Sequence, residues 1–150
     1  MPAAPDSAFR SRGAALRRLA TEGTFAIPGA PLALAAKLIE REGFGAIYLS
    51  GAAFSAGILG VPNIGILTLD QLVAQTRLLA PAVEIPLVVD ADTGFGGPDA
   101  VTDCVRRLEE AGAAAIQLED QPGSAAAGGK RCGHLGGKRV IEPAEMVERI

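Results

Sequence analysis

Two aspartates that directly follow an apolar run have the spacing for chemistry. Asp90 and Asp92 come after Leu87-Val-Val89, and a glycine-rich turn follows them. The run shows no polar alternation, which is typical of a strand covered on both faces in a parallel sheet. Side chains two apart on a strand point the same way, so we expect both carboxylates in one small volume. Their mutual repulsion favours a shared hard cation, Mg²⁺ or Mn²⁺.

The same stretch has a structural interpretation. Short acidic side chains beside glycines commonly bond to local main-chain N–H groups in ordinary turns. Gly94, Gly96 and Gly97 do not form a phosphate loop of the Walker A type, because its spacing and its Lys-Ser/Thr pair are absent. These glycines are better explained as positions where the main chain approaches a ligand. The residues alone leave the cation site and the plain turn as alternatives.

A second candidate group is the cysteine of Lys130-Arg-Cys-Gly-His134. Two cations precede Cys132, and neighbouring positive charge favours the thiolate form. Glycines surround the segment at positions 123, 128, 129, 133, 136 and 137, as expected of a loop that closes over a substrate and excludes water. The alternative is a solvated linker with an incidental cysteine. A zinc site is disfavoured, because one cysteine and one histidine leave it two ligands short.

Alternating strands and helices are expected to position these groups. Apolar runs predict strands at residues 24–27, 46–50, 85–90 and 114–119, and a long loop after residue 52. Helical spacing, capping residues and Pro or Gly boundaries predict helices at 7–21, 32–41, 68–80, 98–111 and 143–150. Thr68 with Gln71 fits a capping box. The helix stripes expected to be buried are Leu69, Leu72, Val73, Thr76 and Leu79, and Val101, Cys104, Val105 and Leu108.

This alternation implies right-handed parallel crossovers, in either a doubly wound sheet or part of an eight-stranded barrel. Both architectures place their chemistry at the carboxyl ends of the strands. The polar groups expected there come from three strands and are Ser50, Asp90, Asp92, Glu119 and Asp120. Their convergence indicates a site.

The composition indicates one globular α/β domain. The 150 residues are 49% apolar and carry a net charge of −3, with 4% aromatic residues. This balance gives neither the basic field nor the stacking surfaces of a nucleic-acid-binding protein. No apolar run has the length of a membrane span and no secretory signal is evident, so we expect a cytoplasmic protein. Two cysteines in dissimilar contexts do not predict a disulfide framework.

Four motifs resemble those of the isocitrate lyase and phosphoenolpyruvate mutase superfamily, and most closely the short methylisocitrate lyases. The resemblance runs from about Phe25 to Ile150. Its motifs are Tyr48-Leu-Ser-Gly-Ala52, Val89-Asp-Ala-Asp-Thr-Gly-Phe-Gly96, Leu118-Glu-Asp-Gln121 and Lys130-Arg-Cys-Gly-His-Leu135. Within the superfamily, the last motif marks the carbon–carbon lyases, whereas phosphonomutases and oxaloacetate decarboxylases lack the cysteine.

The resemblance implies a TIM-type (β/α) barrel with about four strand–helix units in residues 24–150, preceded by an N-terminal helix in residues 1–23. It implies Mg²⁺, or Mn²⁺, at Asp90 and Asp92, with Glu119 acting through water. The implied contacts to a tricarboxylate or dicarboxylate substrate are Ser50, Gly51, Ala52, Cys132, Gly133 and His134.

The implied reaction is retro-aldol cleavage of 2-methylisocitrate to pyruvate and succinate, in propionate breakdown. Cys132 would protonate the succinate carbanion, and Tyr48 is the candidate base. The alternative for Tyr48 is a buried aromatic residue whose hydroxyl is bonded nearby. Closely related lyases that act on 2,3-dimethylmalate or isocitrate are alternatives for the substrate.

Several departures from the family pattern bear on activity. Asn63 replaces a frequent aspartate, Ala52 replaces a frequent glycine, and the link over residues 123–129 is longer than usual. Strands five to eight of the barrel do not follow Ile150, so we expect a truncated chain with negligible lyase activity by itself. A non-catalytic remnant that assembles with partner chains is the alternative from another functional class. The family also implies a homotetramer for the full-length form.

Overall fold

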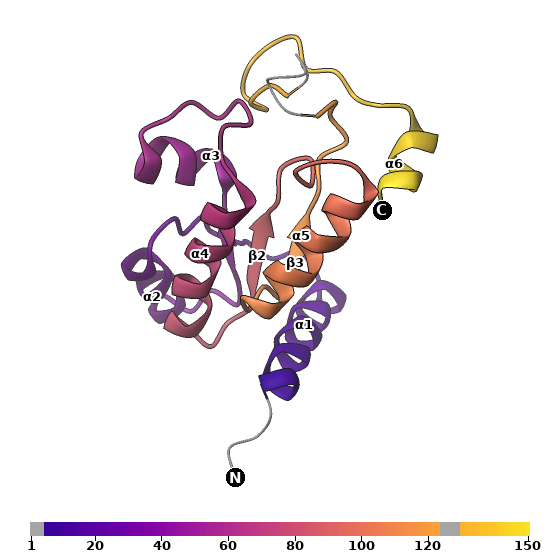
Figure 1. The fold of residues 1–150 in the computed structure, drawn as a ribbon. Coiled ribbons are helices and arrows are strands. Elements are labelled where there is room, and N and C mark those ends of the chain that lie inside the picture. The colour runs from indigo at the N-terminus through magenta and orange to yellow at the C-terminus, as the bar shows by residue number, and fades with distance from the viewer. Residues whose placement is uncertain (1–4, 124–129) are drawn as a thin grey trace.

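The computed structural model describes residues 5–123 and 130–150, with side chains described from residue 12 onward. Its centre is a parallel sheet of three strands in the order β1-β2-β3 (Figure 1). These strands are β1 (Ile47–Leu49), β2 (Leu87–Asp90) and β3 (Ala115–Gln117). Tyr48 lies opposite Val88, and Val88 lies opposite Ala115. The continuous apolar run of β2 therefore occupies the middle strand, as a parallel sheet requires.

The predicted strand at residues 24–27 is wrong. The pairing partner of β1 on that side is a single parallel bridge between Gly29 and Tyr48. The N–H of Ala30 donates to the Tyr48 carbonyl, and the N–H of Tyr48 donates to the Pro28 carbonyl, both at 2.9 Å. Because Pro28 has no N–H, the chain cannot extend this ladder toward residue 24 in the usual pattern.

Five helices lie close to the predicted ranges. They are α1 (Pro5–Glu22), α2 (Ala33–Arg41), α4 (Leu69–Leu79), α5 (Pro98–Glu110) and α6 (Pro143–Arg149). The predicted capping box is present at α4, where Thr68 and Gln71 exchange side-chain and main-chain hydrogen bonds. Val101, Cys104 and Leu108 of α5 are buried. Val105 is 40% exposed, so its predicted burial is wrong, because it lies at the margin of the apolar face.

The segment after β1 is more ordered than the loop predicted for it. A short helix, α3 (Gly51–Phe54), continues into a π-helical turn at Ser55–Leu59. Ser50 caps α3, because its Oγ accepts the N–H of Ala53 at 3.2 Å. The strand therefore ends directly in a helix N-terminus at the carboxyl edge of the sheet.

The long helix α1 covers the opposite, amino-terminal edge of the sheet. The Arg12 guanidinium donates to the carbonyls of Ala80 and Val83 at 2.5 and 3.0 Å. Gly45 packs against the Leu19 side chain so closely that an added Cβ would lie 3.1 Å from it. This position leaves the carboxyl edge free of α1 (Figure 1).

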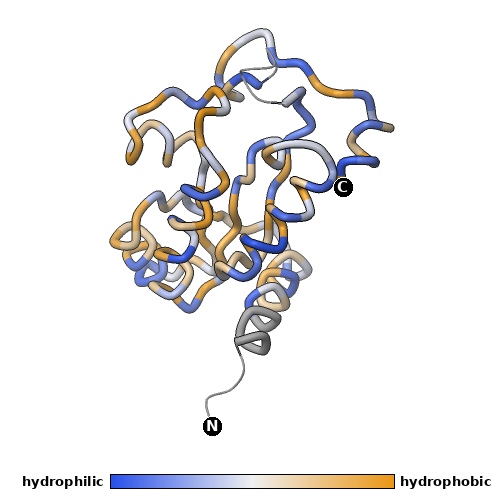
Figure 2. Tube along the Cα trace, in the orientation of Figure 1, coloured by the Kyte–Doolittle hydropathy of each residue, from blue (hydrophilic) through white to orange (hydrophobic). Residues whose placement is uncertain are grey.

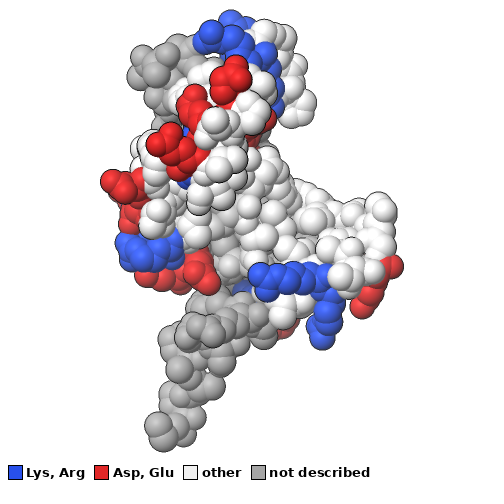
Figure 3. Space-filling model, turned by 90° about the vertical axis from the view of Figure 1, so that its right-hand side faces the viewer, with Lys and Arg blue, Asp and Glu red and all other residues white. Residues whose placement is uncertain are grey.

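The core lies between the sheet and helices α2, α4 and α5, where the apolar segments converge in Figure 2. Its fully buried large side chains include Ile47, Leu49, Leu72, Leu79, Leu87, Val89 and Leu108. None of the helices in the described part of the chain has the length and apolarity to span a membrane. The face shown in Figure 3 carries acidic and basic side chains near one another.

Candidate active site

Asp90 is the last residue of β2 and is 7% exposed. Its Oδ2 accepts the N–H of Gly51 at 3.0 Å, and its Oδ1 accepts the N–H of Asp92 at 3.1 Å. A Cβ at residue 51 would lie 3.2 Å from Asp90 Oδ2, so glycine permits this close approach. The carboxylate thus joins the end of β2 to the beginning of α3.

Asp92 shares the site with Asp90, but the predicted strand geometry is wrong. Strand β2 ends at Asp90, and Asp92 lies in the following turn with a left-handed φ of 57°. Aspartate tolerates this conformation better than most residues. Its Oδ1 accepts the N–H of Thr93 at 2.9 Å, and its Oδ2 forms an ion pair with Lys130 Nζ at 2.6 Å.

The electrostatics around Asp92 are those of an acid-rich site. Burial raises the pKa of the Asp92 carboxyl, and the charges of Glu119 and Asp90 raise it further. Lys130 opposes these effects through its hydrogen bond and its charge. Glu119 itself follows β3, and its N–H donates to the Asp92 carbonyl at 2.7 Å. The two predicted aspartates and Glu119 therefore do converge.

Lys130 is a site residue that the sequence analysis treated only as a charge near Cys132. It is 5% exposed, and its Nζ also approaches Asn63 Oδ1 at 3.4 Å. A buried lysine requires a charged or polar partner. The sequence signal for this contact was the presence of a lysine in the glycine-rich loop together with two aspartates that had no predicted cationic partner. Through Lys130, the cysteine loop is attached to the aspartate turn.

Cys132 lies in this loop and is partly exposed. Its Sγ lies 3.5 Å from His134 Nδ1. The main-chain and ring contacts from His134, together with a contact from Asn63, lower the pKa of the Cys132 thiol. Cys104 has the opposite environment, because burial raises its pKa to about 11. Cys104 is buried in the predicted stripe of α5. The two cations expected to favour the Cys132 thiolate have other partners, because Lys130 pairs with Asp92 and Arg131 donates to the Gly136 carbonyl.

Tyr48 is held by a neighbouring strand. Its hydroxyl donates to Gln117 Oε1 at 2.8 Å. Burial raises the pKa of the phenol, and the negative charges of Asp90 and Glu119 raise it further. In the metal-free site the neutral phenol is therefore favoured, with its hydroxyl as a hydrogen-bond donor.

The remaining predicted substrate residues divide into two places. Ser50 and Gly51 lie at the Asp90 end of β1, where the Ser50 hydroxyl accepts a capping bond and the Gly51 N–H is bonded to Asp90. Ala52 follows them in α3. Gly133 and His134 are exposed in the cysteine loop. Residues 124–129, which include most of the link predicted to be unusually long, lie outside the described residues.

The donor set is consistent with a divalent cation of the Mg²⁺ type. Among residues 5–123 and 130–150, no three His, Cys, Asp or Glu side chains form a group able to hold a metal ion. The site instead offers two buried aspartates near Glu119, with Lys130 as the neighbouring cation. Mg²⁺ commonly takes one or two protein carboxylates and keeps several waters. Asp90, Asp92 and Glu119 are therefore the described residues whose oxygens could hold such a cation.

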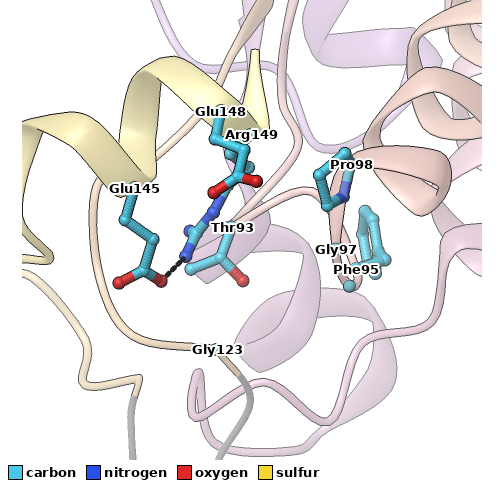
Figure 4. Close-up of a pocket in the computed structure, with 9 residues that line it drawn as sticks. Thr93, Phe95, Gly97, Pro98, Gly123, Glu145, Glu148 and Arg149 are labelled. Carbon is cyan, nitrogen blue, oxygen red and sulfur yellow. Dashed lines mark hydrogen bonds and ion pairs between the residues drawn. The ribbon is translucent and has the colours of Figure 1, made fainter.

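A separate cavity of about 470 Å³ lies between the segment 93–98 and helix α6 (Figure 4). Its wall includes Thr93, Phe95 and the Arg149–Glu145 ion pair, whose atoms are 3.0 Å apart. Phe95 has a left-handed φ of 66°, which is unusual for a bulky side chain. The cavity is not lined by either aspartate or by Cys132, so we do not place the reacting groups there.

The fold and the site define a parallel α/β protein whose polar groups gather at the carboxyl ends of its strands, where enzymes of this architecture carry out their chemistry. A model of the phosphoenolpyruvate phosphomutase family matches residues 16–150. The chain belongs to this family, within the isocitrate lyase and phosphoenolpyruvate mutase superfamily. The resemblance drawn from the four motifs is therefore confirmed.

Similar proteins include several lyases. A 2-methylisocitrate lyase of Aeropyrum pernix is 46% identical over 139 residues, which are 92% of this chain and 43% of that protein. A 2,3-dimethylmalate lyase of Eubacterium barkeri is 42% identical over 88% of this chain and 44% of its own length. The chain thus spans a little less than half the length of these relatives.

Solved structures give the same fold. The crystal structure of a phosphoenolpyruvate phosphomutase from Streptomyces platensis subsp. rosaceus matches with a TM-score of 0.83 and 37% identity, over 91% of this chain and 46% of the other. A phosphonopyruvate hydrolase in complex with oxalate and Mg²⁺ matches with a TM-score of 0.76 and 33% identity, over 92% of this chain and 45% of the other. The relatives and these structures support an enzyme, and the relatives include lyases.

Proposed function

We propose that this chain carries the Mg²⁺ and thiol parts of the active site of a carbon–carbon lyase that cleaves 2-methylisocitrate to pyruvate and succinate. The observation that carries the proposal is the contact between two loops. Asp92 in the turn after β2 is paired with Lys130, two residues before a cysteine whose pKa is lowered. A cation-binding carboxylate pair and a proton-donating thiol are two of the groups that this cleavage requires, and a base for the substrate hydroxyl is the third.

Each residue has a role in the proposal. When bound, Mg²⁺ would polarise the substrate oxygen that becomes the pyruvate carbonyl. Asp90 and Asp92 would hold it, with Glu119 ordering its water, while the Ser50–Ala52 turn and the loop residues Gly133 and His134 contact substrate carboxylates. Because its pKa is lowered, the Cys132 thiol is a stronger acid than an ordinary cysteine thiol, which favours its role in protonating the succinate carbanion.

Tyr48 is assigned a different role from the predicted one. A phenol whose pKa is raised is a weak acid, and its phenolate is scarce near neutral pH. We therefore propose that Tyr48 stays neutral and uses its one O–H to bind Gln117 at the strand ends. Its bond to Gln117 Oε1 keeps the hydroxyl oriented. The base that removes the substrate hydroxyl proton is left unassigned.

The 42% identical 2,3-dimethylmalate lyase supports a second substrate. Both substrates are branched hydroxy acids that can undergo the same retro-aldol cleavage, so the carboxylate pair and the thiol would serve either.

A TIM-type barrel completed by further strands and assembled as a homo-oligomer is the architecture that we propose for the full-length enzyme. Because this chain corresponds to less than half of its relatives, we expect negligible turnover from the 150 residues by themselves.

The test is a coupled assay for pyruvate release from 2-methylisocitrate, 2,3-dimethylmalate and isocitrate, with and without Mg²⁺. It is run on the 150-residue chain and on the product of the complete open reading frame. Where the open reading frame extends beyond Ile150, we expect its product to show turnover that depends on Mg²⁺ and is lost in Cys132→Ser. A Cys104→Ser variant is the matched control and should retain activity. Full turnover by the Cys132→Ser protein would remove the thiol from the mechanism.

A further inference from the structure

Gln121 is a buried polar residue directly beyond the acidic end of β3. Its side chain is 0% exposed, and a polar side chain in that position must find partners within the protein. Gln121 Oε1 accepts the N–H of Arg131 at 3.1 Å, and Gln121 Nε2 donates to the Arg131 carbonyl at 3.0 Å. The amide therefore binds both polar groups of one residue's main chain, as a neighbouring strand would.

Arg131, whose main chain Gln121 binds, lies between the two functional side chains of the cysteine loop. Lys130, immediately before Arg131, forms the 2.6 Å ion pair with Asp92. Cys132, immediately after it, contacts His134 and Asn63. A fixed main chain at residue 131 therefore holds an ammonium group at the aspartate turn and a thiol nearby.

Gln121 is itself held in place from two directions. Its Nε2 also donates to the carboxylate of Glu119, two residues earlier in the segment that follows β3. Its main-chain carbonyl accepts a hydrogen bond from Arg149 Nη1 at 3.0 Å, and Arg149 is 8% exposed. The support for the loop thus combines two residues of the segment that follows β3 with Arg149 of α6.

We propose that Gln121 is a positioning residue that anchors the cysteine loop over the Asp90 and Asp92 carboxylates. It acts through the Arg131 main chain and contacts neither the thiol nor the aspartates. The value of this anchor for lyase chemistry rests on the function proposed above, whereas the anchoring itself can be measured without turnover.

Trypsin provides the first measurement, because cleavable residues occur both inside and outside the anchored part of the loop. Lys130 and Arg131 lie within it, and the exposed Lys138 and Arg139 provide an internal reference. Cleavage at a protected bond follows the population of the opened loop, and two lost hydrogen bonds increase that population. We expect Gln121→Met to speed cleavage at 130 and 131 by about tenfold relative to 138 and 139.

Gln75→Met is the matched control. Gln75 donates to the Pro31 carbonyl at 2.6 Å, far from the cysteine loop in the chain, and its replacement should leave the cleavage ratio unchanged. Gln121→Glu keeps the size and one acceptor but sets an oxygen against the Arg131 carbonyl and Glu119. Gln121→Glu should also raise the rate of cleavage at 130 and 131 relative to 138 and 139. If Gln121→Met does not fold, this variant tests the proposal in its place.

The second measurement is the rate of Cys132 alkylation by iodoacetamide as a function of pH. In the unaltered protein the midpoint should lie below that of an ordinary cysteine, and in Gln121→Met it should move upward as the Asn63 contact is lost. Cys104, which is fully buried, serves as the unreactive reference.

The proposal is overturned if both Gln121 variants keep the original cleavage ratio and alkylation profile, or if they change only as Gln75→Met does. Neither readout depends on lyase turnover, so the outcomes of the two proposals are distinguishable.

Discussion

At the scale of single residues, the site is dominated by carboxylates that outnumber their cationic partner. The charges of Asp90 and Glu119 raise the pKa of Asp92, and Lys130 is the cation paired with Asp92 in the described structure. The Lys130 and Asp92 side chains are 2% and 10% exposed, so each would be a buried charge without the other. Removing one member of such a pair commonly costs about 3–5 kcal/mol of stability.

Lys130→Met should therefore lower the free energy of unfolding of the metal-free chain by about 3 kcal/mol. In an Asp92→Asn background the same replacement should cost much less, because no buried carboxylate is left unpaired. Urea unfolding of the four proteins of this double-mutant cycle measures the coupling. Equal costs in the two backgrounds would show that the pair contributes no coupling energy.

Tyr48 gives a direct test of the electrostatics at β1. It is the single tyrosine of a chain without tryptophan, so ultraviolet absorbance reports it alone. We expect a folded-state pKa above the ordinary value of 10.0. The stabilisation linked to the neutral phenol is then present below pH 10 and is lost as the pH rises through the folded-state pKa, because the unfolded chain ionises first. A midpoint at or below 10 in the folded chain would contradict this expectation.

At the scale of elements, the strand ends and the helix starts determine where the polar groups lie. Ser50 ends the β1 segment and caps α3, so the main chain turns at the point where Gly51 reaches Asp90. Helix α4 begins with the capping box predicted from Thr68 and Gln71. Such local features are readable in sequence because both partners lie within one turn of helix.

Replacing the α4 cap tests this local contribution. Thr68→Ala removes the hydroxyl that accepts the Gln71 N–H and should cost about 1 kcal/mol of stability. Thr102→Ala is the control, because Thr102 is an exposed threonine inside α5 and should change stability by less than about 0.5 kcal/mol. Thermal unfolding compares the two variants, and equal midpoints would argue against the cap.

At the scale of the whole molecule, one core joins the sheet to α2, α4 and α5. Leu87 of the central strand is fully buried, whereas Leu78 of α4 is 64% exposed. The acidic edge and the cysteine loop lie beyond this core, so the strands provide a rigid base for them (Figure 1). The fold therefore separates the groups that stabilise it from the groups that form its site.

Leu87→Ala should lower the free energy of unfolding by about 2–5 kcal/mol, because the loss of buried apolar surface is joined by a cavity. Leu78→Ala removes the same atoms from an exposed position and should cost less than about 1 kcal/mol. Chemical denaturation gives both values. Similar losses in the two variants would contradict the position of the core.

The sequence by itself was sufficient for helices α1, α2, α4, α5 and α6, for three of the strands, for the acidic strand ends and for the family. It missed α3 and the π-helical turn after it, which it predicted as a loop. It failed at residues 24–27, where an apolar run resembles a strand, although Pro28 limits the pairing to a bridge. It also placed Asp92 on the strand, because period-two alternation assumes an extended chain and carries no signal for a left-handed turn at residue 92.

Only the tertiary structure decided how the cysteine loop is attached. Lys130 meets Asp92, Asn63 approaches Lys130 across 67 positions of sequence, and Gln121 binds the Arg131 main chain. Periodicity and capping act over a few residues, so they are visible in the sequence. Contacts between distant loops depend on the path of the whole chain, and one of them is made to main-chain atoms that every residue except proline offers equally.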